Sequence, residues 1–329
     1  MKRITIEKIA SELNLSYSTV RKALNNAGGV SYRKKKKILD YAIKEGYVLK
    51  DNLAQIGIIL PSAPQAIWHT YLTEIMERSE QLGLTCQHFL YENNAFPDDV
   101  MLCLESAEKA GVEVLILGIT CSAGVKPIIE KIRSLAKKIM VIFIEELHED
   151  IEEIYVGEHS YRSAQELARQ YMKKNPKSTR FLAFSKGGHS VDSRIDGFQT
   201  ELEKRGLSFV DVLRFPEKGT AMAAKIARIL NEYRDKIDCV FCASDSVSDM
   251  CLAIKKAGIS NLHCVGFDCT SADMAYFDMG ILKCVARQNI PLQAQTAVDI
   301  AYRYLVHGVK PDRYNGEYHT YIDDYFISN

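Results

Sequence analysis

The sequence predicts an all-α helix-turn-helix head joined to an α/β body of two doubly wound parallel-sheet lobes. Three observations predict it. In the first 50 residues, apolar side chains recur at three- and four-residue spacing, which is the period of an amphipathic helix. From residue 55 on, short apolar runs alternate with helix-length segments, as in parallel sheets covered by helices. This alternation occurs in two series, so two similar lobes are expected.

The predicted head begins with two short helices joined by a tight turn. Asn14 lies at the turn, which needs a residue that tolerates positive φ, and Ser16 is placed to cap the second helix. Ser31 is placed to cap a third helix, with Gly46 after its end. One apolar face is expected on each of the first two helices: Ile6, Ile9, Ala10 and Leu13, then Val20, Ala23 and Leu24.

Charge is divided unevenly between head and body. The chain has 42 basic and 42 acidic residues, but residues 1–50 contain 12 Lys or Arg against 4 Asp or Glu. The rest of the chain therefore has 30 basic against 38 acidic residues. A basic head on an acidic body is typical of a protein that binds nucleic acid through the head.

A helix-turn-helix unit lays its second helix in the major groove of duplex DNA. Tyr17, Ser18 and Lys22 are expected to read base edges, because they follow the start of that helix on its outer face. For Lys34 to Lys37, phosphate contact and an ordinary solvated helix face are equal alternatives. The expected DNA-binding set is Thr5, Ser16, Tyr17, Ser18, Thr19, Arg21, Lys22, Asn25, Arg33 and Lys34.

In the body, ligands of parallel sheets bind beyond the carboxyl ends of the strands, and two facing sheets form a cleft that hinge motion can close. The expected strands are 56–60, 84–89, 112–118 and 139–144 in the first series, and 180–184, 208–214, 239–243 and 263–267 in the second. The expected helices include 71–82, 163–172, 191–205, 221–233 and 246–257.

Other classes of protein find little support in the sequence. No Gly-x-Ser-x-Gly motif, complete dinucleotide fingerprint or phosphate loop is present, and Gly187-Gly188 is too short a signal, so neither an enzyme nor a cofactor is expected. No apolar run has the length of a signal peptide or a membrane span, so a cytoplasmic protein is expected. The nine cysteines suit reduced core thiols. Cys239 and Cys242 should face opposite sides of a strand, so no metal site is expected.

Taken together, head and body resemble the LacI/GalR family of bacterial transcription regulators, whose body is similar to periplasmic sugar-binding proteins of type I. The resemblance spans nearly the whole chain. Its motifs are residues 5–10, 16–25, 30–31 and 46–47 in the head, and 56–61, 193–198, 243–245 and 265–268 in the body.

The resemblance implies a homodimeric repressor that binds a duplex DNA operator and responds to a small effector, a carbohydrate. It also implies effector contacts from Trp68, Glu145, Arg194, Ser244 and Asp268. Each has a structural alternative: Trp68 could anchor a helix start, Arg194 could form a salt bridge, and Asp268 could cap the segment after it. For Glu145, and for Glu158 and Tyr161, the structural alternative is at least as good. The alternative function is a cytoplasmic solute-binding receptor without specific operator binding.

The implied domains are a DNA-binding domain at 1–50, a short linker at 51–55, and an effector-binding and dimerisation domain at 56–329. Its N-lobe is about 56–157 plus 288–314, and its C-lobe about 158–287 plus 315–329. The linker is about ten residues shorter than the family pattern, which has a hinge helix that wedges a leucine into the minor groove. Arg21-Lys22 stands where the family usually has Ser-Arg, which predicts an altered operator.

Overall fold

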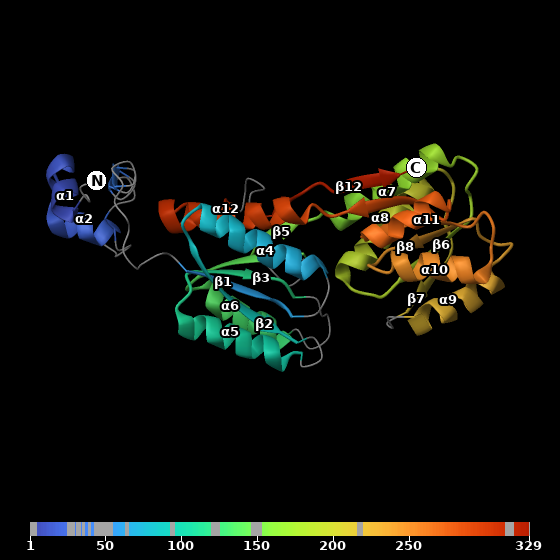
Figure 1. Cartoon of the computed structure of the whole chain (residues 1–329), viewed down its shortest axis with the longest axis horizontal. Helices are drawn as coiled ribbons and strands as arrows, with labels where there is room; N and C mark the ends of the chain where they lie inside the picture. Colours follow the sequence, from blue (N-terminus) through green and yellow to red (C-terminus); the bar gives the residue numbers. More distant parts are fainter. Residues whose placement is uncertain are drawn as a thin grey trace. The chain divides into compact units, whose positions relative to one another are not determined.

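Two six-stranded sheets form the body of the protein, and a pair of short helices precedes them in the chain (Figure 1). The computed structural model describes residues 5–24, 30, 34, 37–38, 41–42, 55–62, 66–92, 96–119, 126–145, 153–215, 220–312 and 319–328. Among them, no helix is long and apolar enough to cross a membrane.

The N-terminal helices are α1 (Ile6–Leu13) and α2 (Tyr17–Leu24). As predicted, Asn14 adopts the left-handed conformation between them (φ 53°), and the Ser16 hydroxyl accepts a hydrogen bond from the Thr19 amide at 3.2 Å. The Thr5 hydroxyl caps α1 by accepting from the Lys8 amide. The predicted apolar faces pack together in a small core, which Ile38 and Ala42 complete. Ser31, Gly46 and residues 51–54 lie outside the described residues.

The first sheet has the order β11-β5-β4-β3-β1-β2. Strand β1 pairs in parallel with both β2 and β3, and β5 pairs in parallel with β11. Helices α4 and α12 lie on one side of this sheet, and α5 and α6 on the other (Figure 1). The strands are β1 (Gln55–Pro61), β2 (Thr85–Tyr91), β3 (Val114–Leu117), β4 (Met140–Ile144), β5 (Ile154–Gly157) and β11 (His319–Tyr321), and the helices α4 (Ala66–Gln81), α5 (Asp98–Ala110), α6 (Lys126–Ala136) and α12 (Ile290–His307).

The second sheet has the order β12-β10-β9-β8-β6-β7. Residues of α7 and α8 share one buried cluster with it, and residues of α9 and α10 share the other, so helices cover both faces. The strands are β6 (Phe181–Ser185), β7 (Phe209–Arg214), β8 (Cys239–Cys242), β9 (His263–Phe267), β10 (Leu282–Arg287) and β12 (Tyr325–Ser328). The helices are α7 (Ser160–Lys174), α8 (His189–Glu203), α9 (Thr220–Glu232), α10 (Val247–Ala257), the short 3₁₀ turn η2 (Ser271–Asp273) and α11 (Met274–Asp278).

The two thiols of β8 confirm the predicted alternation of a strand. Cys239 packs in the cluster under α7 and α8, whereas Cys242 packs in the cluster under α9 and α10. The two sulfur atoms therefore lie on opposite faces of the sheet, where they cannot share one metal ion.

Four strands, β5, β10, β11 and β12, were not predicted from the sequence, and β12 runs antiparallel to β10 at the edge of the otherwise parallel second sheet. Strands β5, β11 and β12 have only three or four residues each, too few to show a clear period. Strands β11 and β12 join one sheet each, and the spacing of apolar residues along the chain cannot predict such pairing between distant segments.

Three short segments carry the chain between the two sets of elements. They are Glu158–His159 between β5 and α7, Gln288–Asn289 between β10 and α12, and Ile322–Asp324 between β11 and β12. Packing divides the molecule into two compact units. The second unit comprises the described residues within 118–129, 143–293 and 319–329, and all members of the cluster described below belong to it.

Candidate functional site

Arg194 is the centre of a buried polar cluster in the second unit. Its guanidinium donates from Nε to Glu158 Oε1 at 2.8 Å, and its second terminal nitrogen lies 2.6 Å from the same oxygen. The other terminal nitrogen donates to the Ala243 carbonyl at 3.1 Å. The Phe267 ring lies under the guanidinium, 3.9 Å from its carbon to the ring centroid. Arg194 is thus fixed by groups at the carboxyl ends of β5, β8 and β9, where parallel sheets bind their ligands.

Two more carboxylates of the cluster, Glu145 and Asp268, follow directly after β4 and β9. Asp268 lies 3.9 Å from Arg194 and retains 27% of its side-chain exposure. Glu145 accepts from the Gln288 amide at 3.2 Å, and Gln288 in turn accepts from Gln293 at 3.3 Å. Both acids have positive φ, 70° for Glu145 and 55° for Asp268. Few residues other than glycine adopt this conformation, and such strain is concentrated at binding and catalytic sites.

Asp324 completes the cluster from the segment between β11 and β12. It is buried, and its carboxyl and that of Glu158 repel each other. The Asp324 carboxyl also forms hydrogen bonds with Glu158, which favours its protonated form, and with Ser163, which favours its ionised form. A buried carboxyl without a partner would be costly, and this shared proton reduces that cost.

The excess of carboxylates changes the acidity of the cluster. Burial, followed by the charges of Asp268 and Glu158, raises the pKa of Glu145 to about 8. Burial likewise raises the pKa of Asp268 to about 6, although Arg194 opposes the shift. Burial and the nearby Glu158 raise the pKa of Asp324 to about 9. Burial alone would lower the pKa of Arg194, but the surrounding carboxylates raise it overall. The guanidinium is therefore charged, whereas the raised pKa values of Glu145 and Asp324 favour their neutral, protonated forms.

The structure brings three of the five predicted effector residues together: Glu145, Arg194 and Asp268. Ser244 is buried beside Ala243, in the loop after β8, and lines a small space with Lys186 and Ser246. Trp68 belongs to the first unit. It is 3% exposed, and its ring stacks on Tyr71 with 5.8 Å between ring centroids, as expected for a residue that anchors a helix.

Sequence reasoning missed Gln288 and Asp324, and it gave Glu158 no more weight than its structural alternative. All three are polar and buried, and all three lie in the segments that join the two sets of elements. The short apolar run directly before Glu158 was the available signal, although it was too short to be predicted as a strand. Gln288 and Asp324 could not be placed because their strands were not predicted.

Most of the predicted DNA-binding residues lie on the exposed surface of the N-terminal helices. Tyr17 is 45% exposed, and Ser18, Arg21 and Lys22 share the outer side of α2, away from the buried Val20. Of the remaining predicted residues, Thr5, Ser16 and Lys34 are exposed, Thr19 is half-buried, and Asn25 and Arg33 lie outside the described residues.

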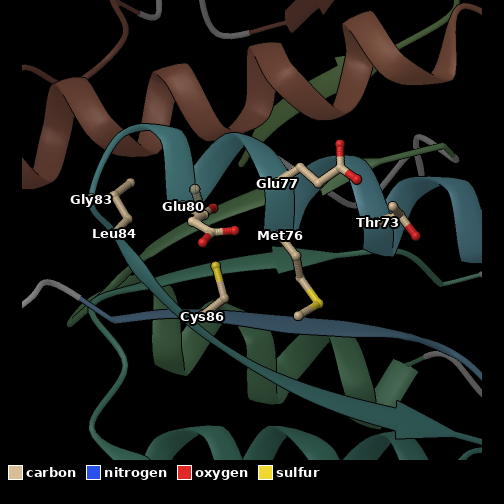
Figure 2. A pocket seen from close by; sticks show the side chains of 8 residues that line it. Thr73, Met76, Glu77, Glu80, Gly83, Leu84 and Cys86 are labelled. Atoms are coloured by element: carbon tan, nitrogen blue, oxygen red, sulfur yellow. The ribbon is translucent and has the colours of Figure 1, made fainter.

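A surface hollow of about 570 Å³ lies in the first unit between α4 and β2. Figure 2 shows Met76 of α4 and Cys86 of β2 pointing into the space between the helix and the strand. Glu77 and Glu80 also line it. None of the predicted effector residues lines this hollow, so the Arg194 cluster is the candidate ligand site.

Residues 56–308 match the family model described as periplasmic binding protein domain. No curated protein sequence matches the chain. Among solved structures, GanP, a glucose-galactose binding protein from Geobacillus stearothermophilus, has a TM-score of 0.71 at 17% identity, covering 84% of this chain and 97% of its own. The Caulobacter myo-inositol binding protein bound to myo-inositol has a TM-score of 0.70 at 19% identity, covering 86% and 95%.

The Lac repressor dimer bound to operator and the anti-inducer ONPF has a TM-score of 0.69 at 16% identity, covering 99% of this chain and 98% of its own. At such identities the likeness shows the fold, a two-lobe α/β body of the periplasmic-binding-protein type. The family and the structural neighbours are sugar-binding proteins and regulators, not enzymes.

Proposed function

Because the chain belongs to the periplasmic binding protein domain family, we propose that it is a DNA-binding transcription regulator of the LacI/GalR type, acting as a repressor. In this proposal its operator affinity is set by a carbohydrate effector bound at the Arg194 cluster. The observation that carries the proposal is the pair of N-terminal helices, in a segment with 12 basic and 4 acidic residues, attached to a binding-protein body.

Support for DNA binding comes from the surface of α2. Arg21 and Lys22 are exposed on the same helix as Tyr17 and Ser18, while Val20 and Ala23 anchor it against α1. A helix held in this way can lie in the major groove with its polar and basic side chains facing the DNA. The Lac repressor likeness includes this segment, since it covers 99% of the chain, whereas the GanP likeness covers 84%.

Support for a carbohydrate effector comes from the chemistry of the cluster. Carboxylates that follow parallel strands bind neighbouring hydroxyls through paired hydrogen bonds, and Glu145 and Asp268 are such groups. The names of the structural neighbours, glucose-galactose binding protein and myo-inositol binding protein, describe ligands rich in hydroxyls. The effector contacts predicted for Trp68 and Ser244 stay predictions.

The domain division predicted from the sequence is retained in the proposal: a helix-turn-helix DNA-binding domain at 1–50, a short linker at 51–55, and an effector-binding and dimerisation domain from 56. A homodimer would place two heads on the two half-sites of a near-palindromic operator. A protein that acts on its operator in this way would work in the cytoplasm.

The second candidate is a solute-binding receptor without specific operator binding. The short linker favours it, because it is about ten residues shorter than the family pattern, which includes a leucine-wedging hinge helix. The solved sugar-binding proteins with this fold also favour it.

Fluorescence anisotropy with the full chain separates the two candidates. Duplexes tiled across the gene's own upstream region are compared with scrambled duplexes of the same length at near-physiological salt. A regulator binds one duplex more tightly than its scrambled control. Lys22→Ala reduces this preference, whereas Lys173→Ala, the same charge change at an exposed position of α7, does not. Equal, weak binding to all duplexes, with or without added sugars, contradicts the regulator and favours the receptor.

A further inference from the structure

We propose that the ligand of the Arg194 cluster is a polyhydroxyl compound without phosphate or carboxylate, and that an amino group in place of one hydroxyl strengthens its binding. The inference rests on the proposed function, since it assumes that the cluster binds the effector. It goes further by specifying the charge of that effector.

Among the described residues, Arg194 is the one cation of the cluster, and its nitrogen atoms already have partners. Its Nε and one terminal nitrogen contact Glu158 at 2.8 and 2.6 Å, and its other terminal nitrogen contacts the Ala243 carbonyl at 3.1 Å. The Phe267 ring covers one face of the guanidinium, and the Arg194 side chain is only 6% exposed. A phosphate or carboxylate would have to displace Glu158 or share the guanidinium with it. Either event leaves a buried carboxylate without its partner.

The groups left for a ligand are acceptors that need donors. Asp268 is the most exposed carboxylate in contact with Arg194, at 27% of its side chain. The buried Glu158 and Asp324 carboxyls form a hydrogen bond with each other, which leaves Asp268 as the acceptor that a ligand can reach. The Gln288 side chain already donates to Glu145 and accepts from Gln293. Hydroxyl and ammonium groups donate hydrogen bonds, whereas ionised phosphate and carboxylate groups only accept them.

The charges of the cluster point the same way. Four carboxyl groups, Glu145, Glu158, Asp268 and Asp324, accompany the single guanidinium. The neighbouring cation Lys186 is paired with Asp245 at 2.6 Å, and Asp245 adds to the negative charge at Asp268. The raised pKa values of Glu145 and Asp268 follow in part from this excess of acid. A further anion would be repelled, and an ammonium group would be attracted.

Isothermal titration calorimetry of the full chain tests the inference with a matched panel. In each of the gluco, galacto and manno series, the probes are the free hexose, the 2-amino sugar, the 6-phosphate and the uronate. We expect, in at least one series, that the amino sugar binds at least as tightly as the hexose. We also expect the phosphate and the uronate to bind at least about 100-fold more weakly than the hexose, because like charges are juxtaposed.

The variant Asp268→Asn gives a second measurement. It removes one partly exposed carboxylate with little change in shape. It should therefore reduce the difference in affinity between the hexose and its 6-phosphate. The control Asp196→Asn makes the same change at an exposed position of α8, two residues from Arg194. It should leave this difference in affinity unchanged.

Each outcome bears on one proposal. A 6-phosphate or uronate that binds as tightly as its hexose overturns the inference but leaves a carbohydrate effector standing. An amino sugar that binds more weakly than its hexose overturns the part concerning the amine. If no member of any series binds, the carbohydrate effector itself is contradicted, and this inference fails with it.

Discussion

Arg194 and Glu158 form an ion pair between α8 and the segment after β5, with the closest nitrogen–oxygen distance 2.6 Å and side-chain exposures of 6% and 1%. Two charges removed from water to this extent depend on each other, since either one left alone would keep its full desolvation cost. The pair therefore fixes the guanidinium before any ligand arrives.

Removal of one partner should be strongly destabilising. We predict that Glu158→Ala lowers the free energy of unfolding by about 3–5 kcal/mol, because the buried guanidinium loses its counter-charge. Urea denaturation followed by circular dichroism measures the change. Lys138→Ala, which removes a 68%-exposed partner of Glu108, should cost less than about 1 kcal/mol. Equal losses in the two variants would show that the buried pair has no special role.

The buried Asp324 carboxyl should make stability depend on pH. Its pKa is raised to about 9 in the folded protein, against about 4 in the unfolded chain. The folded state therefore binds more protons between these values, and this group makes the protein less stable as pH rises from about 4 to about 9. We predict that Asp324→Asn reduces the loss of stability between pH 5 and pH 8 by at least about 1 kcal/mol.

Denaturation midpoints of the native protein and of Asp324→Asn at both pH values provide the measurement. Asp323→Asn, at the exposed neighbouring position, serves as the control and should keep the native pH dependence. A pH dependence unchanged by Asp324→Asn would mean that this carboxyl is already ionised in the folded protein.

Gly197 lies where α8 passes close to α7. A Cβ atom at this position would lie 2.2 Å from the Tyr161 carbonyl oxygen, which belongs to rigid backbone. We predict that Gly197→Ala lowers the free energy of unfolding by about 1–3 kcal/mol through overpacking. Gly57→Ala should cost less, since its Cβ would meet only the side chains of Val112 and Leu115 at 3.2 Å. The opposite ranking in thermal denaturation would disprove the close approach of the helices.

The exposed face of α2 should determine which DNA is bound. We predict that Tyr17→Ala relaxes base preference at one operator position by about 1–3 kcal/mol, because a lost base contact affects one base pair. Anisotropy with single-base operator variants measures this preference. A loss of affinity of equal size on operator and scrambled duplexes would instead assign Tyr17 to contacts with the DNA backbone.

The parts of the site that local sequence describes were predictable, and the parts that depend on tertiary contacts were not. Arg194 and Asp268 lie in motifs that carry the family resemblance, and the structure places them 3.9 Å apart. Gln288 and Asp324 depend on β10, β11 and β12, which the periodicity did not reveal. The outer face of α2 followed from the three- and four-residue spacing of Val20, Ala23 and Leu24 alone.

The measurement closest to the central claim is the linkage between sugar and DNA binding. Operator affinity is measured by anisotropy with and without the sugar that binds best in calorimetry, for the native protein and for Asp268→Asn. We expect saturating sugar to shift operator affinity at least about fivefold and operator DNA to shift sugar affinity by the same factor. The variant should need more sugar for the same shift. Tight sugar binding that leaves operator affinity unchanged would contradict a regulator and identify a receptor.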